Sequence, residues 1–305
     1  MKVILGTDGS ETALFAEKLL TQLVLGLASE IVVVSVLTPP VISSPIGQAA
    51  AVQAYATDLA QLYDELKTHT RKVAEDAAGR LRASGLDVRV VLREGDPGSE
   101  IQEVAEAERA DWIIIGSRGE NALTAMLMGS VARKLISRST CSVLVVHAPE
   151  DAKAADRPGL SAVVGVENEA NADDLTDWVA RFGSHRFNEI VVVCAEPAMI
   201  LPPSLEPVLF MPPTVPDLTF AESVADHAAQ RLAGVTPKLS KMAVSGRPAN
   251  VLIDTAREHQ ADLIFLTAKR HGALERILIG SVSYEVATTA PCSVFIHRPR
   301  GEAQA

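Results

Sequence analysis

Aromatic residues and cysteines are scarce in this chain of 305 residues. Phe, Trp and Tyr together make up 4% of it, and the three cysteines are Cys141, Cys194 and Cys292. An odd number of cysteines, each in or beside an apolar run, indicates buried reduced thiols rather than a disulfide framework. Because such thiols are typical of reducing compartments, we expect a cytoplasmic protein.

The sequence also lacks an excess of positive charge and any long hydrophobic run. Its formal net charge is −10, which argues against nucleic-acid partners because phosphate backbones bind clustered Lys and Arg. The longest apolar run lies within Glu189–Ala198 and is too short to span a bilayer. A predicted strand begins at Lys2, so we expect no signal peptide ahead of it and no membrane partner.

What the sequence does contain is an internal repeat. Shifting the chain by about half its length superimposes its two halves without a gap over their most similar parts. The matched pairs include Gly95 with Gly246, Pro97 with Pro248, Gly129-Ser130-Val131 with Gly280-Ser281-Val282, and Cys141 with Cys292. Matches at one constant spacing indicate a duplicated domain.

Each half alternates apolar strands with amphipathic helices, and this pattern predicts an α/β fold with a doubly wound parallel sheet of five strands and helices on both faces. The strands expected in the first half are 2–7, 30–37, 86–93, 112–116 and 142–147, and those in the second lie near 161–167, 188–195, 238–245, 262–267 and 292–297. The expected division is a first domain at 1–149, a linker at 150–158, a second domain at 159–299 and a tail at 300–305.

Two segments of the first half stand where doubly wound sheets bind ligands, beyond the carboxyl ends of their strands. The first segment ends the first strand and opens the first helix. The second follows the fourth strand, and its two parts are separated by nine residues. The first segment consists of Thr7, Asp8, Gly9 and Ser10, and the second of Gly116, Ser117, Arg118 and Gly119 and then Gly129, Ser130 and Val131.

These residue types suit a phosphate ligand. Glycines allow positive φ and a close approach of the backbone, and Gly129-Ser130 opens a helix whose free N–H groups favour an anion. Arg118 can add a charge-assisted contact. Asp8 can accept a hydrogen bond from a ribose hydroxyl or hold a divalent cation. Taken singly, the same residues also suit a tight turn or an ordinary helix cap.

The spacing Gly-x-x-Gly, nine residues, Gly-Ser resembles the nucleotide loop of the universal stress protein family, and the resemblance covers both halves. It implies the strand order 3-2-1-4-5 and an adenine near Val36 and Ile115. It also implies bound ATP, ADP or AMP with Mg²⁺ held through Asp8, and a role in the stress response. Single-domain members dimerise through the fifth strand, so the resemblance implies that the two halves form that dimer within one chain. Whether two whole chains also form a homodimer stays open.

The second half has lost most of this pattern. Thr267 and Arg270 replace the two loop glycines, Glu167 replaces Asp8, and Gly280-Ser281-Val282 remains. A Cβ makes positive φ costly and keeps the backbone away from a phosphate. We therefore expect a mainly structural or partner-binding domain here, although Lys269, Arg270 and His271 offer an alternative anion site.

Three functions remain open from the sequence. The first is a binding protein that takes up ATP in its first half and is not an enzyme. The second is a slow ATP hydrolase, which the lack of a Gly-x-x-x-x-Gly-Lys-Ser/Thr loop disfavours. The third is a scaffold that binds no nucleotide and acts on an unknown protein partner through the segment 196–217, which contains seven prolines.

Overall fold

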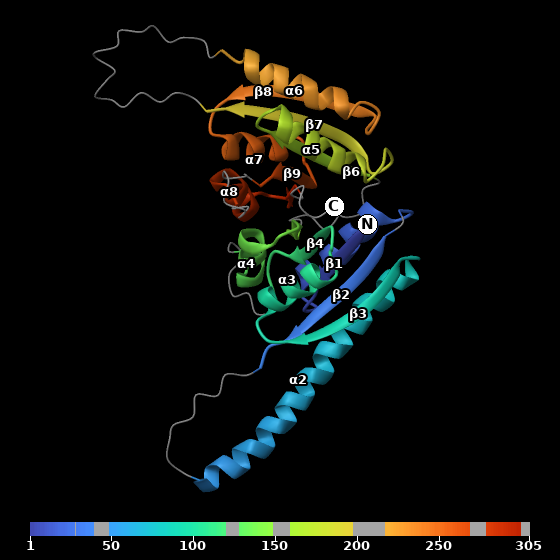
Figure 1. Ribbon diagram of the computed structural model, residues 1–305, viewed down its shortest axis with the longest axis vertical. Helices are drawn as coiled ribbons and strands as arrows, with labels where there is room; N and C mark the ends of the chain where they lie inside the picture. The colour runs from blue at the N-terminus through green and yellow to red at the C-terminus, as the bar shows by residue number, and fades with distance from the viewer. Residues whose placement is uncertain are drawn as a thin grey trace, which may run out of the picture. The chain divides into compact units, whose positions relative to one another are not determined.

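The computed structural model describes residues 1–27, 29–39, 49–119, 128–148, 159–197, 217–268 and 279–299, and only the backbone of 49–58. The chain forms two compact units, Met1–Ala148 and Pro149–Ala305 (Figure 1). The expected linker 150–158, the tail 300–305 and most of the proline-rich segment 196–217 lie outside the described residues.

The first unit contains five strands and four helices within its described residues. Its strands are β1 (Lys2–Gly6), β2 (Glu30–Leu37), β3 (Asp87–Glu94), β4 (Trp112–Gly116) and β5 (Ser142–Val146). Its helices are α1 (Glu11–Val24), α2 (Ala49–Ala83), α3 (Pro97–Ala107) and α4 (Ser130–Arg138). The start of α3 is the predicted one, since the Asp96 side chain accepts from Ser99 N at 2.9 Å ahead of Pro97.

The sheet of the first unit has the order β3-β2-β1-β4-β5, and all its strand pairs are parallel. Helices α1 and α2 contact one another and pack on one face, and α3 and α4 do so on the other. Gly6 at the end of β1 pairs with Val34 in β2 and with Ile115 in β4. The order therefore reverses at β1, and the carboxyl ends of β1 and β4 lie side by side.

The second unit repeats this architecture. Its strands are β6 (Leu160–Val166), β7 (Phe187–Glu196), β8 (Lys238–Ser245), β9 (Leu263–Thr267) and β10 (Ser293–His297), in the order β8-β7-β6-β9-β10. Its helices are α5 (Glu169–Ala180), α6 (Thr219–Arg231), α7 (Pro248–Glu258) and α8 (Ser281–Thr289). The predicted fold class and strand order are thus confirmed in both units.

Buried apolar side chains cover the sheets of both units. In the second unit, scarce aromatic residues gather in the core, where the rings of Phe182, Phe187, Phe265 and Phe295 lie with centroids 5.4 to 6.4 Å apart. The three cysteines are buried, as expected, and none of them forms a disulfide. Among the described helices, none combines the length and the apolar character needed to cross a membrane.

Candidate functional site

A cavity of about 570 Å³ opens at the carboxyl ends of β1, β2 and β4 in the first unit. The structure brings both predicted segments to its wall, with the exception of Gly9 and Ser10. The predicted residues that line it are Thr7, Asp8, Val36, Ile115, Gly116, Ser117, Arg118, Gly119, Gly129, Ser130 and Val131. Residues more than 100 positions apart in the chain therefore meet in one place.

Hydrogen bonds tie the two segments together. The Ser10 hydroxyl accepts from Ala13 N at 3.3 Å, as a helix cap does, and donates to the carbonyl of Arg118 at 3.2 Å. Thr12 also donates its hydroxyl proton to the carbonyl of Arg118. Ser10, expected as a nucleotide contact, thus caps α1 and joins the two segments. Thr12, which also joins the two segments, was not singled out from the sequence.

The loop glycines are needed for close packing rather than for a positive φ. Neither Gly116 nor Gly119 has a positive φ, and that of Gly129 is −64°, whereas Gly9 has a φ of 79°. A Cβ on Gly116 would overlap the Thr12 hydroxyl, and one on Gly119 would lie 2.6 Å from Asp8 Oδ2. The expectation that these loop glycines turn the chain through positive φ is therefore wrong for Gly116, Gly119 and Gly129.

The second segment presents donors to the cavity. Gly129 N donates to the carbonyl of Ser117 at 2.8 Å, which brings the two ends of the loop together. Gly129 is the N-cap of α4 and has no side chain to cap the N–H groups of the first turn. The Ser117 hydroxyl is buried and makes no hydrogen bond within the described residues. Such groups favour an anionic, hydrogen-bonding ligand.

The end of β2 offers a backbone donor and acceptor. The carbonyl of Val34 accepts from Thr7 N at 3.0 Å on the β1 side, and that of Leu37 accepts from Gly95 N at 2.9 Å on the β3 side. Because successive residues direct their backbone groups to opposite edges of a strand, the N–H and C=O of Val36 face the β1 side. The N–H and C=O of Val36 lie two residues past Val34, whose carbonyl bonds to Thr7, and Val36 lines the cavity.

Helix α2 supplies a wall that the sequence analysis missed. Leu66, His69, Thr70 and Val73 line the cavity, and their spacing places them on one face of the helix. A Cβ on Gly9 would lie 3.2 Å from Val73 Cγ2, so the helix packs directly on the first segment. The amphipathic spacing within 48–84 was a usable signal, but it could not show which face would meet the two segments.

At the carboxyl ends of its strands, the second unit keeps the glycine that starts the helix but little else of the site in the first unit. Gly280 has a φ of −70° and a ψ of 155°, close to the −64° and 160° of Gly129. Thr267 ends β9 at the place of Gly116, and its hydroxyl is buried. The alternative anion site at Lys269, Arg270 and His271 lies outside the described residues.

One additional carboxylate distinguishes this end of the second sheet from the first. The strand registers place Glu196 of β7 where the first unit has Leu37 in β2, and Glu167 stands in the place of Asp8. Burial, and then the carboxylates of Glu196 and Glu167, raise the pKa of the Cys194 thiol to about 11. Glu196 thus adds a negative charge where the first unit has an apolar side chain.

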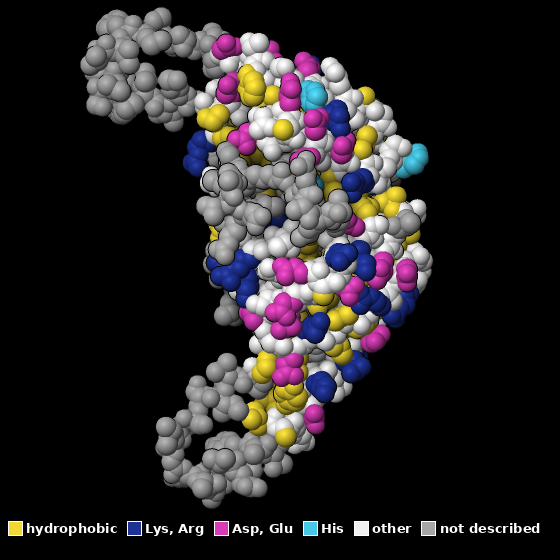
Figure 2. Space-filling model, viewed as in Figure 1, with side chains coloured by type: hydrophobic (Ala, Val, Ile, Leu, Met, Phe, Trp, Pro, Cys, Tyr) yellow, Lys and Arg dark blue, Asp and Glu magenta, His cyan; other side chains and the backbone are white. Residues whose placement is uncertain are grey.

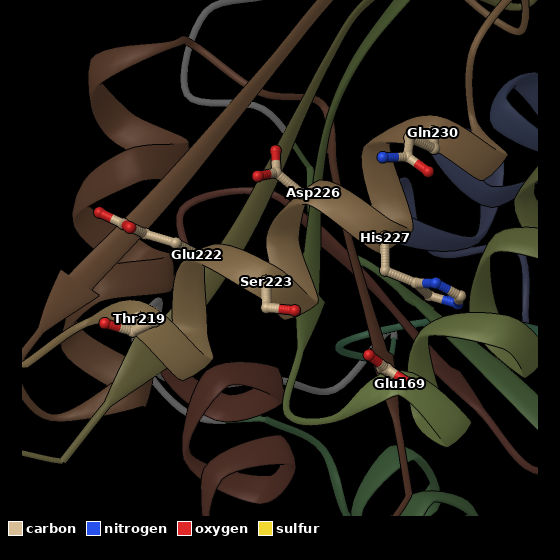
Figure 3. A pocket seen from close by; sticks show the side chains of 7 residues that line it. All are labelled: Glu169, Thr219, Glu222, Ser223, Asp226, His227 and Gln230. Carbon is tan, nitrogen blue, oxygen red and sulfur yellow. The ribbon is translucent and has the colours of Figure 1, made fainter.

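A second hollow lies between α5 and α6, and Figure 3 shows Glu169 on one helix facing the row of polar side chains on the other. Two of its charged groups have protein partners, since His227 Nε2 lies 2.8 Å from Asp173 Oδ1 and Lys241 pairs with Asp226. Within the described part of the chain, no group of three or more His, Cys, Asp or Glu side chains could hold a metal ion. This hollow is a solvated polar surface.

Acidic and basic side chains are interspersed over the described surface on the face drawn in Figure 2. This distribution agrees with the net charge of −10. The cavity of the first unit is therefore the strongest candidate site on this chain, because it combines concave shape, apolar walls and converging polar groups.

Comparison with known proteins agrees with the repeat. The model of the universal stress protein family matches residues 1–147 and again 161–298. A universal stress protein of Mycolicibacterium smegmatis is 26% identical over 283 residues, which cover 88% of this chain and 87% of the relative. One from Mycobacterium tuberculosis is 28% identical over 229 residues, or 74% of each chain.

Solved structures show the same fold. A universal stress protein from Archaeoglobus fulgidus superimposes with a TM-score of 0.67 at 19% identity, covering 98% of both chains. Because the family model accounts for both halves and two-domain relatives match along most of their length, the duplication is a feature that this chain shares with them. The chain belongs to the universal stress protein family.

Proposed function

We propose that the first unit binds an adenine nucleotide, with ATP as the leading candidate, and that occupancy of this site is the signal by which the protein acts in the stress response. The observation that carries the proposal is the cavity of about 570 Å³, where the predicted phosphate loop, Asp8 and the end of β2 converge. In this proposal the protein is a binding protein and not an efficient enzyme.

The phosphates would lie against the second segment. The first turn of α4, beginning at Ser130, supplies N–H groups and the positive end of the helix dipole. The Ser117 and Ser130 hydroxyls can donate further hydrogen bonds, and Arg118 at the cavity wall can contribute positive charge. Gly119 lets the backbone pass beside Asp8 without steric overlap.

The nucleoside would lie between the first segment and β2. The N–H and C=O of Val36 form a donor and acceptor pair that matches the N1 and amino group of adenine. Asp8 lines the same cavity and can accept from a ribose hydroxyl or share a Mg²⁺ ion with the phosphates. The Mg²⁺ would then depend on the nucleotide for most of its ligands.

The second unit would serve as a structural or partner-binding domain. Thr267 carries a side chain where the first unit has Gly116, and Glu196 places a carboxylate where the first unit has the apolar Leu37. A cytoplasmic location suits a chain whose three thiols are buried and form no disulfide. Slow ATP hydrolysis is the second candidate, since Asp8 lines the cavity beside Gly119 of the proposed phosphate loop.

The test is calorimetric titration of the full chain with ATP and Mg²⁺ after bound nucleotide has been removed. We expect a stoichiometry near one per chain. Ser130→Ala should weaken binding about tenfold or more, because it removes a hydrogen bond to a charged group. Ser281→Ala changes the matching residue at the start of α8 and should leave the affinity unchanged.

Absence of any ATP binding would refute the proposal. A stoichiometry near two, with both serine variants weakening binding, would show that the second unit also takes up nucleotide. Steady phosphate release that rises with ATP and disappears in Asp8→Ala would favour the hydrolase instead.

A further inference from the structure

Helix α2 turns a mixed face toward the cavity of the first unit. Leu66 and Val73 are apolar, whereas His69 and Thr70 between them are polar. The helix runs beside β3 and past the edge of the sheet in Figure 1. Ala74, Ala77, Ala78 and Leu81 pack its later turns into the core, whereas residues 60–72 are mostly exposed, with Leu66 and Thr70 half-buried at the cavity wall.

The hydroxyl proton of Thr70 is already engaged in a hydrogen bond within α2. Its Oγ1 donates to the carbonyl of Leu66 at 2.8 Å, one turn earlier in α2. A hydroxyl has one proton and two acceptor lone pairs. With the proton engaged, the hydroxyl is left to accept, so a ligand group that meets it at the cavity wall has to be a hydrogen-bond donor.

The position of Thr70 places this acceptor at the base end of the cavity. Thr70 and Leu37 line both the main cavity and a smaller one of about 300 Å³ beside it. Leu37 directly follows Val36, whose backbone N–H and C=O face the main cavity beyond β1. The phosphate loop lies on the other side, at β4 and α4.

We propose that Thr70 is a specificity-determining residue, which accepts a hydrogen bond from the exocyclic amino group of adenine. This inference rests on the proposed nucleotide site. The amino group carries two hydrogens, of which one would reach the carbonyl of Val36 and the other Thr70 Oγ1. A base with an oxo group in place of the amino group would place a carbonyl oxygen, which only accepts hydrogen bonds, against the Val36 carbonyl and Thr70 Oγ1, which also accept. The site rejects such a base.

The experiment measures the affinities of the full chain for ATP and ITP, whose bases differ in this amino group and in the proton that N1 carries in ITP and lacks in ATP. The wild-type protein should bind ATP more tightly. Thr70→Val keeps the shape of the side chain but removes the acceptor, so ATP affinity should fall about 2- to 12-fold, the range expected for one hydrogen bond. ITP affinity should stay the same or rise, and Thr70→Ser should retain the wild-type preference.

Thr68 provides the matched control, since it is exposed on the same helix and is not part of the cavity wall. Thr68→Val should leave both affinities unchanged. Equal loss of ATP and ITP binding in Thr70→Val, or no loss of either, would overturn the inference while nucleotide binding itself stands. If neither nucleotide binds the wild-type protein, the proposed function fails as well.

Discussion

Gly116 and Thr12 meet where β4 ends beneath the first turn of α1. A Cβ on Gly116 would overlap the Thr12 hydroxyl and lie 2.9 Å from the backbone N of Ala13. The Thr12 hydroxyl cannot move aside without losing its bond to the carbonyl of Arg118. At this scale the shape of the proposed phosphate loop depends on the absence of one methyl group.

Gly116→Ala should therefore destabilise the protein by about 1 to 3 kcal/mol, the usual cost of overpacking. Gly79→Ala is the control, because Gly79 lies in α2 with no atom within 4 Å of its would-be Cβ. That substitution should stabilise by about 0.5 to 1 kcal/mol, as expected for an exposed helical position. Urea unfolding of both variants measures the difference, and equal stabilities would contradict the packing argument.

At the scale of elements, an ion pair fixes α2 on α1. The carboxylate of Glu17 is buried in α1, and Arg80 of α2 reaches it with Nε at 2.7 Å and Nη2 at 3.0 Å. The Arg80 side chain is half exposed, so water screens part of the interaction. The pair helps hold in place the helix that forms one wall of the cavity.

Arg80→Met should cost about 1 to 3 kcal/mol, because it leaves a buried carboxylate without its charged partner. Lys72→Met breaks an exposed pair with Asp76 on the same helix and should cost at most about 0.5 kcal/mol. Chemical denaturation of the two variants tests this ordering. Losses of similar size would show that the position of α2 depends on apolar packing alone.

At the scale of the whole molecule, the two units should respond differently to acid. His297 at the end of β10 is buried and stacks on Trp178 with ring centroids 5.2 Å apart. Burial, and then the charge of Arg181, lower the pKa of His297 to about 4.

The direction in which stability changes with pH follows from proton uptake by the unfolded chain. Between pH about 6.5 and about 4 the unfolded chain binds a proton that folded His297 does not. The contribution of neutral His297 to the free energy of unfolding is therefore complete above pH about 6.5. It is lost as the pH falls, by up to about 3 kcal/mol. Each unit has one tryptophan, so Trp112→Phe leaves Trp178 to report on the second unit. Urea unfolding near neutral pH and near pH 5 measures the loss, which His297→Leu should reduce. An unchanged loss in that variant would assign it to other groups.

Much of the fold could be predicted from the sequence because it depends on local periodicity. The apolar run 30–37 became β2 with those bounds, and Asp96-Pro97 marked the start of α3. The constant offset between the halves showed the duplication. The family resemblance added the strand order, which the pairing of both sheets confirms.

The site could be predicted only in part. The spacing of Gly116, Gly119, Gly129 and Ser130 located the loop, although their contacts with a nucleotide remain a prediction. The sequence could not show that Ser10 donates to the carbonyl of Arg118 or that Thr70 lines the cavity, because each role depends on which residues meet across the fold.

The sequence by itself determined the elements, their order and the positions of the loop glycines, since backbone preferences and apolar spacing act between near neighbours. Only the tertiary structure decided that α2 forms a wall of the cavity, that Thr12 requires Gly116 to lack a side chain, and that carboxylates gather at the edge of the second sheet. The physical reason is that these contacts join residues far apart in the chain, and packing alone sets their distances.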